Sequence, residues 1–181
     1  MTSAILPPPP PPPGLRSWPD RSALLADRAR ALRTLTHSAL SPRRLALSAM
    51  LTSGYVLAWV SFAYATGWPH LAFGAALLAA CAVPTWFTLR RERYLRHLAT
   101  AWATLDPDPA SVPQWRAPAR ALTWLAYALA LIVLALALLT TPLTGTASPV
   151  PLGIAAILLA AGAHGLAQVL GYRRLLRAER A

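Results

Sequence analysis

Four apolar segments without a single charged residue constrain this chain more than any other feature. They cover residues 45–65, 71–89, 121–140 and 151–171, and none of them contains Asp, Glu, Lys or Arg. A hydrocarbon core about 30 Å thick is crossed by roughly 20 apolar residues in an α-helix. A charge at the centre of such a helix costs at least ~3 kcal/mol on insertion scales. The sequence therefore predicts four transmembrane helices.

The composition favours the same interpretation. Apolar residues make up 56% of the chain and charged residues 13%, with a mean hydropathy of +0.44, whereas soluble domains contain about 25% charged residues. Four long charge-free stretches would be unusual for buried helices of a soluble all-α protein. The chain also has one cysteine, Cys81, so an intrachain disulfide and dithiol redox chemistry are excluded.

The segment before the first apolar stretch does not look like a secretory signal, which would place its apolar core near the start of the chain. It opens instead with an unbroken proline run, Pro7 to Pro13, which is typical of an extended polyproline II segment. We expect residues 1–19 to be a disordered tail and the first apolar segment to remain in the membrane as an anchor.

Arginine placement predicts the orientation. All 17 basic residues are arginines, and they lie in residues 1–44, 90–120 and 172–181, which carry net charges of +5, +3 and +3. The two remaining connections, residues 66–70 and 141–150, contain no arginine. Positively charged loops stay in the cytoplasm, so we expect both termini on the cytoplasmic side of the cell (cytoplasmic or inner) membrane.

The predicted fold is all-α and integral to the membrane, with two transmembrane hairpins, residues 42–89 and 121–171. Residues 20–41 have a modest apolar side, interrupted by Arg28, and are expected to form an amphipathic helix on the inner leaflet. The second span is expected to continue as a helix to about Leu105, where the Asp-Pro-Asp-Pro sequence that follows stops it. Residues 90–120 are expected to form a basic loop, which is irregular from the end of this helix to Pro118. Residues 172–181 are expected to form a basic tail.

The net charge of +11 would suggest nucleic acid as the partner of a soluble protein. Here the arginines are explained by topology and by attraction to anionic lipid headgroups, worth ~1 kcal/mol per charge near the surface. We therefore expect the bilayer, and a second copy or another membrane protein, as partners, and no nucleic acid.

The four spans offer few polar candidates for a site: His164, Gln168, Cys81 and Tyr127. His164 and Gln168 are four residues apart and share one helix face. An ionisable group inside a membrane is a functional candidate by default, but a neutral His bonded to Gln also serves as a packing contact, and we favour that role. No carboxylate lies within the spans, and no cofactor or metal is expected because a haem needs a second axial ligand and no Cys/His cluster has metal spacing.

Three function classes remain open. The lack of any catalytic constellation favours a non-enzymatic scaffold, assembly factor or accessory subunit. A small transporter or a channel subunit working as an oligomer is the alternative, and it would depend on His164 because coupled carriers need a titratable group in the membrane. A membrane enzyme acting on lipid or quinone is the second alternative, and it would need an acid/base pair or a nucleophile with a base.

Overall fold

The computed structural model describes residues 9–10, 18–106, 108–140 and 149–178, and every regular element in these ranges is helical. The proline run lies almost wholly outside the described residues, and so does the connection 141–148. The elements are α1 (Arg21–Ala39), α2 (Pro42–Ala63), α3 (Trp68–Ala103), the 3-10 turn η2 (Pro109–Ser111), α4 (Val112–Trp115), α5 (Pro118–Thr140) and α6 (Pro149–Ala178).

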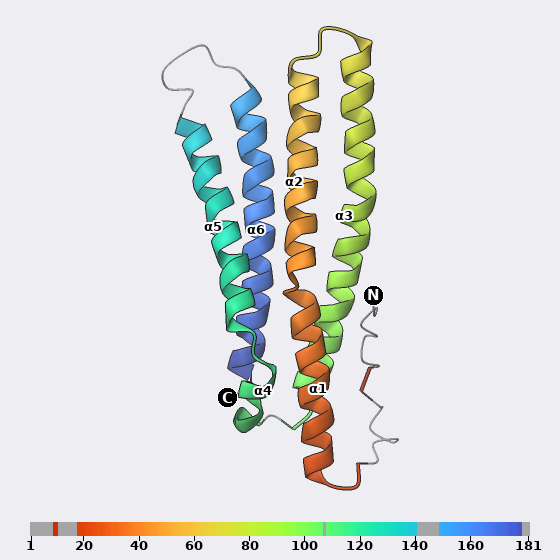
Figure 1. Ribbon diagram of the computed structural model, residues 1–181, viewed down its shortest axis with the longest axis vertical. Coiled ribbons are helices and arrows are strands. Elements are labelled where there is room, and N and C mark those ends of the chain that lie inside the picture. Colours follow the sequence, from red (N-terminus) through yellow and green to blue (C-terminus); the bar gives the residue numbers. More distant parts are fainter. Residues whose placement is uncertain (1–8, 11–17, 107, 141–148, 179–181) are drawn as a thin grey trace.

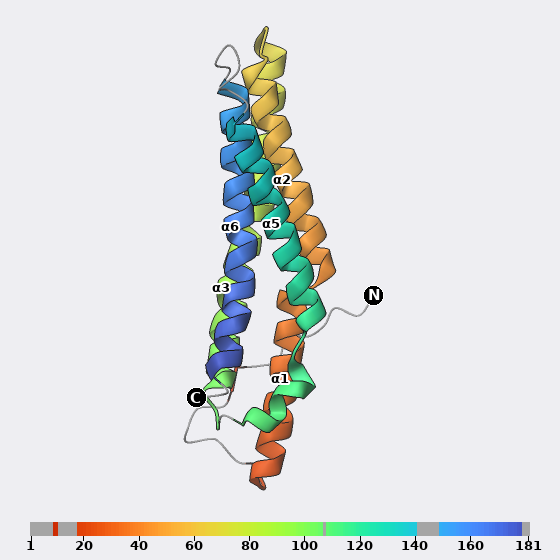
Figure 2. The same cartoon turned by 90° about the vertical axis from the view of Figure 1, so that its left-hand side faces the viewer.

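Four helices stand side by side along the long axis of the molecule, and α1 prolongs α2 toward one end (Figure 1). α2 packs against α3 and α6, and α6 packs against α5 along most of its length. The view turned by a quarter (Figure 2) shows α4 beside α1 at the same end as the C-terminus of α6. The predicted all-α class is thereby confirmed for the described residues.

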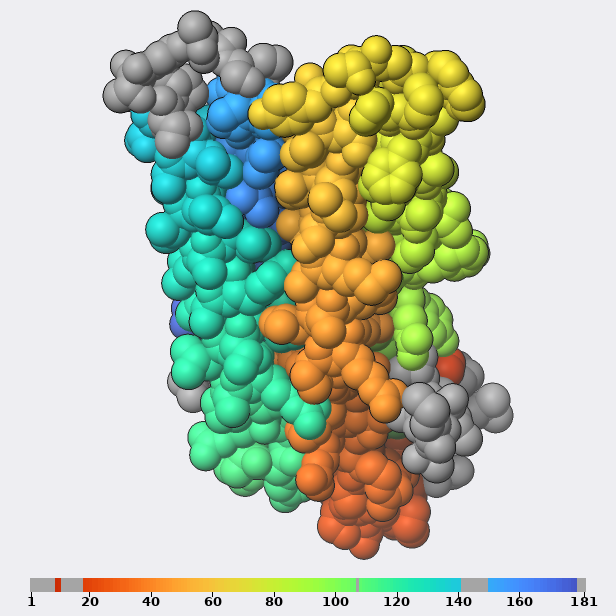
Figure 3. All heavy atoms as spheres, turned by 45° about the horizontal axis from the view of Figure 1, so that its top comes forward, coloured from red at the N-terminus to blue at the C-terminus, as the bar shows by residue number. Residues whose placement is uncertain are grey.

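Each of the four predicted spans lies on a helix that is long and apolar enough to cross a membrane: Arg21–Ala63, taken as one run, Trp68–Ala103, Pro118–Thr140 and Val150–Ala178. Large apolar side chains are exposed on the outside of these helices. Figure 3 shows as spheres the face of the bundle on which α5, α2 and α3 lie. Among the exposed ones are Met50, Leu57, Phe73, Val83, Trp86, Phe87, Leu122, Val133, Leu136 and Leu152. Soluble monomers rarely expose apolar surface on this scale.

The end of the bundle that contains α1 and α4 has a hydrophobic core of its own. It joins buried side chains of α1, α3, α4, α5 and α6, and its most deeply buried members are Leu32, Leu35, Trp115 and Trp124. The apolar side of α1 therefore rests on α3 and α4. This differs from the expectation that α1 lies on the inner leaflet, because the C-terminal part of α3 extends far enough to cover that side.

Arg28 occupies the middle of this contact and is completely buried. Its Nε donates to the carbonyl oxygen of Trp102 (3.1 Å), its Nη2 to that of Ala103 (3.0 Å), and its Nη1 lies 3.5 Å from Ser111 Oγ. The last carbonyls of a helix have no partner within the helix and carry partial negative charge. The arginine that seemed to interrupt an apolar side therefore caps the C-terminus of α3 and joins it to α1.

Two further contacts fix this end of α1. Asp20 caps the helix by accepting from the backbone N–H of Ala23 (2.7 Å). Arg21 Nε lies 2.6 Å from Asp106 Oδ2, and this hydrogen bond lowers the pKa of Asp106. The segment after Asp106, expected to be irregular, contains η2 and α4, which are held by the fully buried Trp115.

We predict that Arg28→Met destabilises the protein by about 2–3 kcal/mol, because it removes the buried charge-assisted hydrogen bonds to the carbonyl oxygens of Trp102 and Ala103. Thermal unfolding in detergent measures the loss. Arg33→Met is the matched control, since Arg33 is exposed on the same helix. Equal melting temperatures for the two variants would contradict the capping role of Arg28.

Candidate functional site

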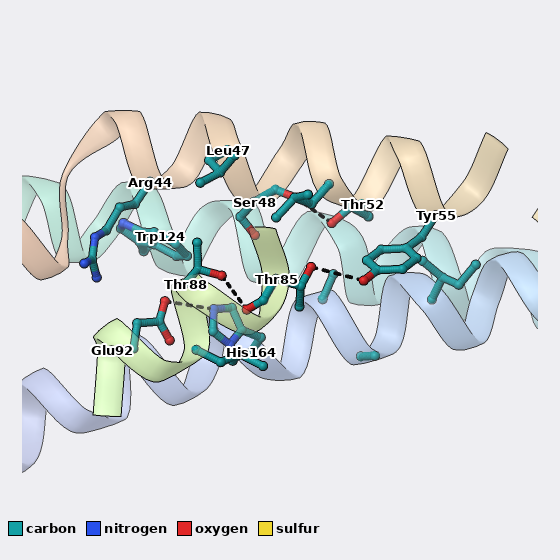
Figure 4. Close-up of a pocket in the computed structure, with 15 residues that line it drawn as sticks. Arg44, Leu47, Ser48, Thr52, Tyr55, Thr85, Thr88, Glu92, Trp124 and His164 are labelled. Carbon is teal, nitrogen blue, oxygen red and sulfur yellow. Dashed lines mark hydrogen bonds and ion pairs between the residues drawn. The ribbon is translucent and has the colours of Figure 1, made fainter. Parts of the chain in front are cut away.

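A cavity of about 400 Å³ lies between α2, α3, α5 and α6 (Figure 4). We call it the central cavity. Apolar and hydroxyl side chains form most of its wall, and charged groups gather at one end. Its lining residues are Arg44, Leu47, Ser48, Leu51, Thr52, Tyr55, Thr85, Thr88, Leu89, Glu92, Trp124, Ile157, Ala160, Ala161 and His164.

Glu92 carries the acidic group of this site. It follows Leu89 by three residues on α3, so it lies just past the apolar segment, and only 7% of its surface is exposed. Its Oε1 is 3.4 Å from His164 Nε2, and Arg96 Nη2 is 3.8 Å from its Oε2. Burying a carboxylate is costly unless a charge or a hydrogen bond compensates it, and His164 supplies that contact from α6.

His164 and Gln168 were predicted to share a face of the fourth span, and their side chains indeed meet, with 3.5 Å between the two Nε2 atoms. The structure adds Glu92 to this pair. No carboxylate lies within the four apolar segments, but the side chain of Glu92, which belongs to the basic loop that follows the second segment, contacts His164.

Three buried polar atoms around the charged end of the central cavity have no hydrogen-bond partner among the described residues. They are Arg44 Nη1, Glu92 Oε2 and Trp124 Nε1. Figure 4 shows these three side chains at the same end of the cavity, with Tyr55 at the other. Glu92 Oε2 is nevertheless 3.8 Å from Arg96 Nη2, whereas the donors Arg44 Nη1 and Trp124 Nε1 have no hydrogen-bond partner in the described part of the chain. Most buried side-chain polar atoms in proteins are paired, so these two donors beside one cavity indicate room for a group that accepts hydrogen bonds.

Tyr127 and Cys81, the other predicted candidates, lie apart from this end. Tyr127 Oη is 3.4 Å from Thr52 Oγ1, which is a contact between α2 and α5. Cys81 is buried, and a side chain added at Gly54 would collide with its sulfur, so it serves close packing of α3 on α2. It is not among the residues that line the central cavity.

A second hydroxyl contact ties the far end of the cavity. Tyr55 Oη donates to Thr85 Oγ1 (3.1 Å), and Thr85 Oγ1 donates to the carbonyl oxygen of Cys81 (2.8 Å). The first bond joins α2 to α3, and the second lies within α3, where it spans Pro84. They leave the apolar middle of the cavity without any charged group.

Sequence reasoning missed Arg44 and the pairing of Glu92 with His164, because charges close to the end of an apolar segment are interpreted as a cytoplasmic boundary. Trp124 was not among the predicted candidates either, although it is 1% exposed and lines the central cavity. The sequence did contain a signal for Glu92, which is the one acidic residue among four arginines in residues 90–96. An acidic residue there reduces the positive charge that determines topology, so it indicates a different role.

Within the described ranges, no group of three or more His, Cys, Asp or Glu side chains could hold a metal ion. Comparison of the chain with models of known families, with curated proteins and with solved structures finds no match.

We predict that His164→Leu lowers the stability by about 1–3 kcal/mol, because it leaves the buried Glu92 carboxylate without its donor. His164→Gln should lose less, since an amide can also donate. A double-mutant cycle with Glu92→Gln, measured by thermal unfolding in detergent, should show coupling between the two positions. Additive effects of His164→Leu and Glu92→Gln would disprove the pairing.

Proposed function

We propose that this protein spans a cell membrane four times, as the hairpins α2–α3 and α5–α6 with both termini in the cytoplasm, and that it binds a small amphiphilic molecule in the central cavity without chemically changing it. The observation that carries the binding role is the pair of buried donors without hydrogen-bond partners among the described residues, Arg44 Nη1 and Trp124 Nε1, at one end of a cavity walled mostly by apolar and hydroxyl side chains.

Two observations support the membrane placement. The helices expose large apolar side chains over the length that corresponds to the charge-free segments. The arginine-rich parts of the chain, including α1, the C-terminal part of α3 and the end of α6, gather at the opposite end of the bundle (Figure 1). A one-sided arginine distribution is what the positive-inside rule requires.

The binding role follows from the character of the cavity. Ligand sites are concave, mostly apolar and contain a few convergent polar groups, with volumes of about 300–1,000 Å³. The central cavity meets this description. An amphiphile would place its apolar part along Leu47, Leu51 and Ile157 and its polar end beside Arg44 and Trp124. This proposal keeps the non-enzymatic class expected from the sequence and gives it a ligand.

A carrier is the second candidate, and the pair Glu92–His164 favours it. Coupled carriers need a titratable group next to the substrate path, and this pair lines the central cavity with its nearest atoms 3.4 Å apart. A carrier would move its ligand across the membrane, whereas a binding subunit would only hold it. Transport of a ligand by the purified protein in vesicles would distinguish the two.

The proposed topology predicts one-sided labelling. With Cys81 replaced by Ser, a cysteine at Thr144 or Ser148 should react with a membrane-impermeant maleimide added to intact cells. A cysteine at Arg177 should react only after the membrane is permeabilised. The opposite pattern, measured on blots of labelled protein, would reverse the orientation.

The binding role predicts that the purified protein retains an amphiphile and that filling the cavity removes it. Ala161→Phe places a ring in the central cavity, and Ala163→Phe, on the exposed side of the same helix, is the matched control. Mass spectrometry of solvent extracts should find a stoichiometric amphiphile with the wild type and the control and much less with Ala161→Phe. Thermal unfolding confirms that both variants fold, and equal retention by both would refute the proposal.

A further inference from the structure

A second cavity, of about 700 Å³, lies between α1, α3 and α6 toward the arginine-rich end of the bundle. We call it the basic groove. Arg44 and Glu92 line both the basic groove and the central cavity, so the two cavities meet at these side chains. The other lining residues are Leu35, Thr36, Ala39, Leu40, Leu95, Arg96, Ala99, Thr100, Ala103, Thr104, Ala167, Gln168, Leu170, Gly171, Tyr172, Arg174, Leu175 and Ala178.

The charge of the basic groove is positive. Three arginines line it, Arg44, Arg96 and Arg174, against the single carboxylate of Glu92. That carboxylate is already compensated by His164 at 3.4 Å and by Arg96 at 3.8 Å. Arg44 is not satisfied in the same way, because its Nη1 is buried without a hydrogen-bond partner.

We propose that the two cavities form one site for an anionic amphiphile, whose phosphate or carboxylate head binds Arg44, Arg96 and Arg174 and whose apolar chain runs into the central cavity. This inference rests on the binding role proposed above and specifies the chemical class of the ligand. A planar guanidinium donates in a fork that matches the oxygens of a carboxylate or a phosphate.

Both halves of the ligand follow from the lining. A small inorganic anion would leave the apolar wall of the central cavity without contacts. A neutral apolar molecule would leave the donors Arg44 Nη1 and Trp124 Nε1 without hydrogen-bond partners. A cationic head would meet three arginines and one carboxylate that is already engaged. The orientation is also that of an inner-leaflet lipid, with its head at the arginine-rich end and its chain between the spans.

The test uses the full-length protein, cleared of bound amphiphile, in phosphatidylcholine nanodiscs, with radiolabelled dodecyl phosphate as the probe. Unlabelled dodecanoate should compete for the site, because it offers the same anionic head and chain. Inorganic phosphate and dodecyltrimethylammonium should not compete, because the first lacks the chain and the second has the opposite charge.

Paired arginine variants locate the head. Arg44→Gln should weaken dodecyl phosphate binding about tenfold or more, the effect of losing one charge-assisted bond. Arg43→Gln, an exposed neighbour outside both cavities, should bind like the wild type. Arg96→Gln and Arg174→Gln should weaken binding relative to their exposed controls Arg93→Gln and Arg173→Gln. Trp124→Phe, which keeps a ring but removes the Nε1 donor, gives a second test if Arg44→Gln does not fold.

Each other outcome overturns the inference. Competition by dodecyltrimethylammonium equal to that of dodecanoate would exclude an anionic head, and competition by inorganic phosphate would exclude the chain. Equal losses with Arg43→Gln and Arg44→Gln would mean surface attraction only. Any of these results would overturn the anionic amphiphile as the class of ligand. The proposed binding role itself would still hold if Ala161→Phe abolishes retention of the amphiphile. It fails as well if Ala161→Phe removes nothing.

Discussion

The length of α3 determines the rest of the structure. Its 36 residues extend over about 54 Å at 1.5 Å per residue, whereas a hydrocarbon core needs only about 30 Å. One part of the helix therefore exposes large apolar side chains, and the other part requires a protein surface to cover it. α1, α4 and the end of α6 supply that surface, and Arg28 binds the carbonyls at which α3 ends. The described chain thus combines an apolar bundle with a helical cap that resembles the core of a soluble domain.

The side chains of the candidate site lie where these two parts meet. Glu92 belongs to the turn of α3 that follows its last apolar residues, and α6 crosses there with His164 and Gln168. A carboxylate in water would need no partner, and a carboxylate deep in lipid would be too costly to keep. At the boundary it can be buried at moderate cost if a donor from another helix reaches it. The same boundary places Arg44 beside it on α2, so both charges of the site come from residues that flank spans.

The sequence predicts the four helices well because the absence of charge over some twenty residues is a local property. It also predicts that His164 and Gln168 share a face, since a spacing of four residues determines that within one helix. It does not predict Glu92–His164 or Arg28–Trp102, which join residues 72 and 74 positions apart. Local patterns treat each polar side chain as facing water or lipid. Arg28 faces neither water nor lipid, because its guanidinium binds the end of another helix. The sequence pattern therefore wrongly indicated that Arg28 interrupts the apolar side of α1.

The energetics of the central cavity explain why a ligand accounts for it better than an empty space does. Each buried polar atom left without a partner costs about 1–3 kcal/mol, and two such donors, Arg44 Nη1 and Trp124 Nε1, would offset a sizeable part of a typical folding stability of about 5–15 kcal/mol. Water could pair with Arg44 and Glu92 at the charged end, but a buried water needs two to four polar partners. Leu47, Leu51 and Ile157 offer none, and the hydroxyls of Thr52, Thr85 and Thr88 in the same wall already donate to backbone carbonyls. An amphiphile satisfies both ends at once, since its head pairs the donors and its chain fills the part of the cavity that water would not wet.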